Sequence, residues 1–232
     1  MNKIEVKEEI NKQVFKLDED TSIYCTSCSN DLELEVYKDV KVFMYVSSSN
    51  VNIRCNIKSN FVLNIFSVNS TLNVDLDLNS DDIELDYAYS TINLDDNKYV
   101  VNINHNKSNI KSNIVNHGLN MENNDLTFVI NAKACKDILN INTNQDSKII
   151  LVKEKSAFIK PNLLVDNDDI VANHSAYIGD FKKNDIFYLS SRGLSEEDCK
   201  RLLAKSFLIG NMKDITFRQV QMIKDKLNLY WR

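Results

Sequence analysis

The chain has 232 residues, 43% of them hydrophobic, and a formal net charge of −5 with its basic residues scattered among acidic ones. This composition predicts a folded protein with a sizeable core, and it argues against nucleic acid, which needs a concentrated basic patch. No apolar run approaches the roughly 20 residues of a membrane span, and the charged N-terminus does not resemble a signal peptide. An odd number of cysteines, 5, fits free thiols better than a disulfide framework. We therefore expect a cytoplasmic protein that binds neither membrane nor nucleic acid.

Residues 1–20 are mixed and charged, and they predict either a helix or a short leading strand. From residue 21 the chain changes to short runs in which apolar and polar side chains alternate, as at Leu32, Leu34 and Val36. Alternation of this kind is typical of strands with one buried face. The runs recur about every ten residues and are separated by turns rich in Asn, Asp and Ser. We expect residues 21–183 to form a β-structured core.

Regular short strands indicate a sandwich, a barrel or a β-solenoid. So many short strands would make an unusually large sandwich, and the Asn-Gly and Asp-Gly pairs of tight hairpins are absent from the sequence. In a solenoid the inward aliphatic side chains would stack from coil to coil, so that each coil buries the face of its neighbour. The pattern favours the solenoid, and the sandwich remains the alternative.

The last part of the chain, residues 184–232, is predicted to be a small helical domain that closes the end of the β-stack. Residues 184–191 indicate one or two helical turns, and Gly193 suits the left-handed position that follows a helix. Two further helices should begin at capping signals, Ser195 with Asp198 and Thr216 with Gln219. Their expected apolar faces are Cys199, Leu202, Leu203, Ser206 and Phe207 in the first, and Val220, Ile223 and Leu227 in the second.

Few residues point to chemistry by themselves. Cys25 and Cys28 form a CxxC with no second pair to complete a zinc site, so they are predicted to be ordinary cysteines near a turn. His105 and His117 lie about one expected coil apart and are predicted to be ladder or surface residues rather than ligands. No phosphate-binding loop, GxSxG or HExxH occurs. His174 is expected at the end of the last strand, near the junction with the helices, and the residues alone favour a structural role for it. They single out no pair of acids for glycoside hydrolysis.

The segment from Pro161 to Phe207 carries a recognisable pattern: P-x-L, Asp-Asp before an apolar strand, H-S-A-x-x-G, then F-Y-x-x-x-R-G-L-S and an amphipathic helix. The residues on this pattern are Pro161, Leu163, Asp168, Asp169, His174, Ala176, Gly179, Phe187, Tyr188, Arg192, Gly193, Ser195 and Phe207. It resembles the C-terminal signature of the SufB/SufD family of iron–sulfur cluster assembly proteins. A weaker likeness extends back through His105, Ser112, Gly118, Phe128 and Ala134.

The resemblance implies a mainly β fold, a right-handed parallel β-helix with a small C-terminal α-helical domain. It implies a SufD-like, non-catalytic scaffold subunit that works with a SufC-like ABC-type ATPase and a SufB-like protomer. An iron–sulfur cluster would be held transiently and shared with a partner, and this chain would bind no nucleotide. His174 matches a histidine that the family uses at its cluster site, and the strand before it has no cysteine, which resembles SufD rather than SufB. The implied partner-binding residues are Phe187, Tyr188, Arg192, Gly193, Ser195, Leu202, Leu203 and Phe207.

The chain departs from the family pattern in two ways. It is much shorter than typical members, with little of their N-terminal helical region, and Ser175 follows the histidine where the family usually has glycine. These departures leave open a divergent scaffold that pairs with a second copy of itself. The alternative of a different class is a β-solenoid carbohydrate-active enzyme, which would need a cleft with clustered acids and aromatic side chains.

Overall fold

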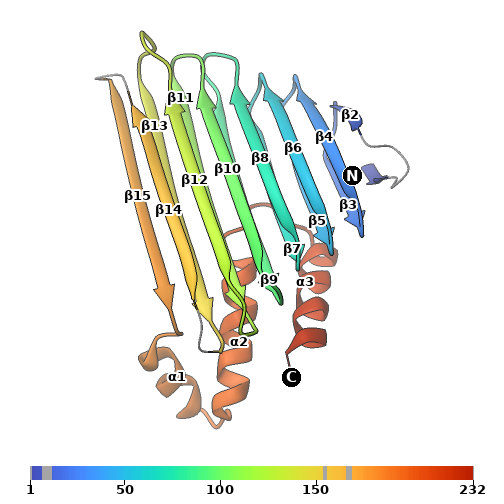
Figure 1. The fold of residues 1–232 in the computed structure, drawn as a ribbon, viewed down its shortest axis with the longest axis vertical. Coiled ribbons are helices and arrows are strands. Elements are labelled where there is room, and N and C mark those ends of the chain that lie inside the picture. The colour runs from blue at the N-terminus through green and yellow to red at the C-terminus, as the bar shows by residue number, and fades with distance from the viewer. Residues whose placement is uncertain (1, 7–11, 154–155, 166–168, 232) are drawn as a thin grey trace.

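The structure, a computed structural model, describes residues 2–6, 12–153, 156–165 and 169–231. In these residues 15 strands form two parallel sheets, and helices follow at the C-terminal end (Figure 1). The 8-stranded sheet contains β1 (Asn2–Glu5), β3 (Thr21–Thr26), β5 (Val40–Ser47), β7 (Phe61–Val68), β9 (Glu84–Asn93), β11 (Ile110–Asn120), β13 (Ile141–Leu151) and β15 (Ile170–Gly179). The 7-stranded sheet contains β2 (Lys12–Leu17), β4 (Ser29–Val36), β6 (Asn50–Ile57), β8 (Thr71–Leu78), β10 (Asn97–His105), β12 (Leu126–Ala134) and β14 (Ala157–Val165). The helices are α1 (Lys183–Ser190), α2 (Glu196–Ile209) and α3 (Phe217–Tyr230).

The chain alternates between the two sheets, so each coil of the solenoid contributes one strand to each. Asn52 lies 21 residues after Asp31, on the next coil, and donates a hydrogen bond to its carboxylate. In the last coils the equivalent hydrogen bond, from Asn162 to Asn131, joins residues 31 apart, so these coils are longer. Every strand pairing is parallel and in register, which confirms the β-solenoid and excludes the antiparallel sandwich.

Alternating strands stack their apolar side chains in columns between the sheets. Leu34, Cys55 and Leu76 occupy the same register position on successive coils, and all are fully buried. The turns are made largely by residues other than glycine. Ser27, Ser48 and Asn69, at equivalent turns, have φ of 54°, 49° and 46°, the left-handed region that short polar side chains tolerate best.

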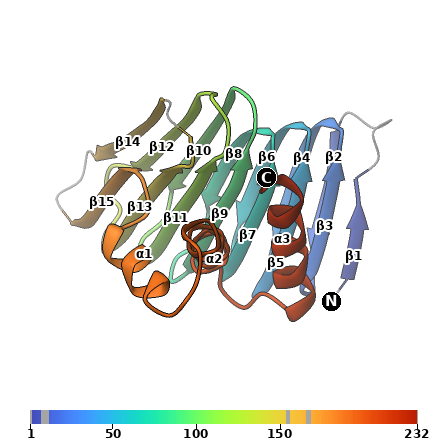
Figure 2. The same cartoon turned by 90° about the horizontal axis from the view of Figure 1, so that it is seen from below.

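Helices α2 and α3 lie along the outer face of the 8-stranded sheet (Figure 2). Ala204 and Leu208 of α2, and Ile223 and Leu227 of α3, share a second core with outward side chains of the sheet. Those side chains are Phe43, Tyr45, Phe66, Val68, Ile92, Leu119, Met121 and Ile150. The helices therefore cover a face of the solenoid, and the prediction that they close its end was wrong. β5 and β7 are buried on both faces near their C-terminal ends, which is typical of strands covered on both sides.

The predicted capping signals are confirmed. Ser195 accepts a hydrogen bond from the Asp198 N–H at the start of α2, and Thr216 with Gln219 forms a complete capping box on α3. Gly193 has φ of +93°. The predicted apolar face of α2 was partly wrong, because the fully buried residues are Cys199, Ala204 and Leu208, whereas Leu202 and Ser206 are exposed. None of the helices in the described part of the chain is long and apolar enough to cross a membrane.

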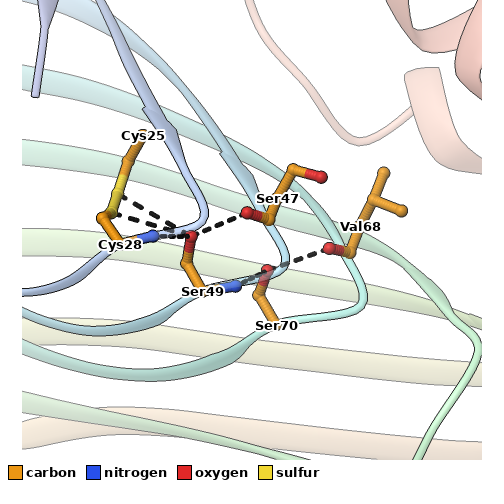
Figure 3. Close-up of a disulfide and its surroundings, with 6 residues drawn as sticks. All are labelled: Cys25, Cys28, Ser47, Ser49, Val68 and Ser70. Carbon is orange, nitrogen blue, oxygen red and sulfur yellow. Dashed lines mark hydrogen bonds between the residues drawn. A yellow bond between two sulfur atoms is a disulfide. The ribbon is translucent and has the colours of Figure 1, made fainter. Parts of the chain in front are cut away.

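Cys25 and Cys28 are joined by a disulfide at the turn between β3 and β4 (Figure 3). This corrects the prediction of free thiols for these two, whereas Cys55, Cys135 and Cys199 are free. Cys28 begins a column of stacked turns, because its N–H donates to Ser49 Oγ at 3.1 Å and the Ser49 N–H donates to Ser70 Oγ at 3.3 Å.

Candidate functional site

The solenoid finishes in two strands that each pair on one side only: β15 with β13, and β14 with β12. We call this pair of edge strands, β14 with β15, the open end. An unpaired edge presents free backbone N–H and C=O groups and is a template for another strand. Large apolar side chains are exposed on these two strands: Phe158, Leu164, Val165, Val171, Tyr177 and Ile178. In the described residues this combination of free edges and apolar side chains is a surface suited to a protein partner.

His174 lies in the middle of β15, at the open end. The sequence placed it at the end of the last strand, near the junction with the helices, and that position was wrong. Its register partner on β13 is Gln145, which in turn is in register with Ile114 of β11. Ile114 and Gln145 are buried between the sheets. His174 continues their inward column and is exposed because no further coil covers it.

The interior of the last coils contains several buried polar side chains among its apolar ones. The buried ring of His105 contacts the Lys133 carbonyl through Nδ1 at 3.1 Å and Ser112 Oγ through Nε2 at 2.9 Å. Ser112 donates onward to Thr143 Oγ1 at 2.8 Å. Burial lowers the pKa of His105, which favours its neutral ring. His105 is therefore an interior hydrogen-bonding residue on β10, two strands in from the edge strand β14.

Gln145 is another buried polar side chain of the last coils, and the sequence analysis missed it. It is 1% exposed, and neither its Oε1 nor its Nε2 has a hydrogen-bond partner among the described residues. The signal that could have revealed it is its position, because β13 alternates inward and outward residues and Gln145 falls on an inward one between Thr143 and Ser147. A polar residue at an inward position needs a partner or a function.

His117 lies on the outer face of the 8-stranded sheet, on β11, whereas His105 lies on β10 of the other sheet and points into the interior, so these two histidines do not share a face. Its Nδ1 donates to the Phe207 carbonyl at 2.7 Å, and its ring stacks on the Phe207 ring with centroids 4.2 Å apart. Burial lowers its pKa to about 4. His117 therefore joins the sheet to the last turn of α2.

The predicted partner-binding residues fall into two groups. Phe187 and Tyr188 project from α1 with 76% and 57% of their surfaces exposed, and the Arg192 guanidinium lies 5.3 Å from the Tyr188 ring centre. Leu202 on α2 is also exposed. Leu203 and Phe207 are half-buried, and Gly193 and Ser195 shape the turn and cap between α1 and α2. Asp168, part of the recognised pattern, lies outside the described residues.

In the described part of the chain the candidate ligands are single groups. Among the described residues no three His, Cys, Asp or Glu side chains lie close enough together to hold a metal ion. His174 offers an imidazole at the open end, and imidazole is a suitable ligand for iron. Cys199, on α2, is buried, as the sequence predicted for a core residue.

Comparison with known proteins agrees with the family resemblance of the recognised pattern. Residues 45–207 match the family model described as SUF system FeS cluster assembly, SufBD core domain. The chain belongs to the SufBD family. It is 32% identical over 81 residues to the iron–sulfur cluster assembly protein SufD of Bacillus subtilis, covering 34% of this chain and 18% of that protein. SufBD family proteins of Pyrococcus horikoshii and Mycobacterium leprae are 41% identical over 69 residues and 35% identical over 86, covering 30% and 37% of this chain. The chain spans only 16% to 21% of the length of these three curated relatives.

Proposed function

We propose that this chain is a cytoplasmic, SufD-like scaffold subunit of a SufBCD-type complex that assembles and transfers iron–sulfur clusters. The family match over residues 45–207 is the observation that carries the proposal. The likeness to the SufD protein of Bacillus subtilis supports the SufD-like assignment. In this proposal the chain catalyses no reaction alone and binds no nucleotide, because ATP hydrolysis belongs to a SufC-like ATPase partner.

The open end is the surface proposed for a second β-solenoid, either a SufB-like protomer or another copy of this chain. Its two edge strands offer unpaired backbone groups, and Tyr177 and Val171 add exposed apolar area on β15. A partner strand would pair with these edges and bury the apolar side chains. Such pairing would also enclose His174, because its column faces the interior of the solenoid.

The ATPase is proposed to dock on α1 and on the adjacent exposed side of α2. None of the residues of α1 is buried, so the helix makes little use of its aromatic side chains within this chain. Phe187 and Tyr188, with Arg192 beside them, form an aromatic and cationic group of the kind enriched at the centres of protein interfaces. Leu202 extends this surface onto α2.

The cluster is treated as the substrate of this complex, held for a time and passed on. His174 would supply one ligand from this chain, and partner side chains would supply the others, since no cluster of three ligating residues occurs in the described chain. Enclosure by the partner would shield the nascent cluster from solvent, because the His174 column lies between the two sheets.

Co-purification tests the partner assignment. The tagged full chain, expressed with its neighbouring genes, should retain an ABC-type ATPase. Substituting both exposed aromatic residues of α1, Phe187→Ser with Tyr188→Ser, should abolish retention of the ATPase. As a control, Phe158→Ser at the open end should leave the ATPase bound and weaken the contact with the second solenoid. A complex that contains no ABC-type ATPase would reject the proposal.

A further inference from the structure

Gln145 is a buried amide whose hydrogen-bonding capacity is unused. Its side chain is 1% exposed, and both its amide atoms lack a partner among the described residues. A buried polar group without a partner destabilises the folded state. The inward residues on either side of it on β13 are paired: Thr143 accepts from Ser112 at 2.8 Å, and Ser147 accepts from Asn116 at 3.0 Å. Gln145 is therefore an exception within its own strand.

The register limits which side chains Gln145 can reach. On one side its in-register neighbour is Ile114, which has no hydrogen-bonding side chain. On the other side it is His174, on the adjacent parallel strand. Strands in a sheet lie about 4.8 Å apart, so in-register side chains on one face are in direct reach of each other. His174 is thus the polar in-register neighbour of Gln145, and its ring can rotate because no coil lies above it.

We propose that Gln145 is a positioning residue for His174: its Oε1 accepts the N–H of one ring nitrogen and so leaves the other nitrogen unprotonated and directed at the open end. No hydrogen bond joins the two side chains in the structure, and a rotation of the exposed His174 ring would form it. Histidines that bind metals usually donate their second N–H to a carbonyl or carboxylate, which fixes the tautomer. This inference rests on the proposed function, because it names the residue that prepares His174 for iron.

The tautomer can be read directly by long-range proton–nitrogen NMR on the full chain labelled with ¹⁵N-histidine, at a pH where the rings are neutral. The chain has 3 histidines, and His105 and His117, with their own fixed partners, act as internal reporters of the fold. The wild-type His174 signals should show one tautomer. Gln145→Met, which keeps the length but removes both amide groups, should shift both nitrogens of His174 toward averaged values.

Two further variants make the test specific. Gln145→Asn withdraws the amide by one methylene and should also release the His174 tautomer. Thr143→Val is the matched control, because Thr143 is an inward residue on the same strand; it should alter the signals of His105 through Ser112 and leave His174 unchanged. Unchanged His174 signals in either folded Gln145 variant would overturn the inference.

A second readout separates this inference from the proposed function. In the assembled complex Gln145→Met should lower cluster affinity or yield about tenfold or more, as loss of a partner that orients a metal-binding histidine commonly does. If His174→Ala leaves the cluster yield unchanged, the proposed function of His174 fails even where the tautomer responds to Gln145. If the tautomer ignores Gln145 while His174→Ala abolishes the cluster, only the role of Gln145 fails.

Discussion

His117 donates a hydrogen bond from Nδ1 to the carbonyl oxygen of Phe207 at 2.7 Å, while the two rings stack at a centroid distance of 4.2 Å. The acceptor is one of the last carbonyls of α2, which no residue of the helix itself can satisfy. A single side chain of the sheet thus provides a hydrogen bond for a carbonyl at the end of α2 and also packs against the helix. Phe207, expected from its family position to bind a partner, is engaged within the chain.

The buried position of His117 predicts a pH-dependent contribution to stability. Burial lowers the pKa of His117 from 6.5 to about 4; the hydrogen bond to the Phe207 carbonyl opposes this shift, Lys148 adds to it and Asp146 opposes it. The unfolded state therefore binds the proton first as the pH falls. Keeping His117 neutral therefore contributes about 3 kcal/mol to the free energy of unfolding. This contribution is complete above pH 6.5 and is lost as the pH falls from 6.5 to about 4. Urea unfolding of wild type and His117→Leu should show a difference in free energy that shrinks over this range. Parallel pH profiles would contradict the assignment.

Asn64 anchors the loop between α2 and α3 to the sheet. Its Nδ2 donates to the Lys213 carbonyl at 2.8 Å, and its Oδ1 accepts from the Lys213 N–H at 3.1 Å. Asn64→Ala leaves both backbone groups unpaired and should cost about 1–3 kcal/mol and speed hydrogen exchange in α3. Asn52→Ala removes ladder bonds from an exposed site, where water replaces them, and is the control. Equal costs for the two variants would refute the anchoring role.

Gly118 is required by close packing between the sheets. A Cβ at this position would lie 2.6 Å from Leu126 Cδ2 and 2.8 Å from Phe128 Cζ. Gly118→Ala should therefore destabilise the protein by about 1–3 kcal/mol through overpacking. Chemical denaturation measures this directly. A change within about 0.5 kcal/mol would mean that the neighbouring side chains move aside at little cost.

The Cys25–Cys28 pair can be replaced by residues that the next coil already uses. Cys25 is in register with Val46 on the next coil. Cys28 immediately precedes β4, and Ser49 holds the equivalent position immediately before β6. There the Ser49 hydroxyl donates to the Ser47 carbonyl at 2.7 Å. The disulfide closes a very short loop, so its loss costs at most about 2 kcal/mol. The double variant Cys25→Val with Cys28→Ser should therefore fold with only a small loss of stability.

Cys55→Ser is the control for that variant. Cys55 is fully buried between Leu34 and Leu76, and burial raises the pKa of its thiol. A serine hydroxyl there has no partner in its column and should cost about 1–3 kcal/mol. Thermal unfolding that shows the double variant to be less stable than Cys55→Ser would contradict the equivalence of the turns.

Alternation in the sequence predicted the solenoid, because stacked columns such as Leu34 over Cys55 need one apolar face per strand. The position of α2 and α3 could not be predicted from alternation, since Phe43 and Phe66 interrupt it and their contacts with the helices join residues far apart in the chain. His174 was found through its motif. Gln145 was missed, because its importance comes from being in register with His174. Alternation within each strand does not show which residues of two neighbouring strands are in register.

The most direct test of the account is cluster assembly on the purified complex, followed by visible absorbance and iron content under anaerobic conditions. His174→Ala should abolish or sharply reduce the cluster without releasing the partners. The control is Asn173→Ala, the adjacent residue of β15, which is in register with the exposed Asn144 and should leave the yield unchanged. Undiminished cluster formation in His174→Ala would contradict the proposal that this residue holds the cluster at the open end.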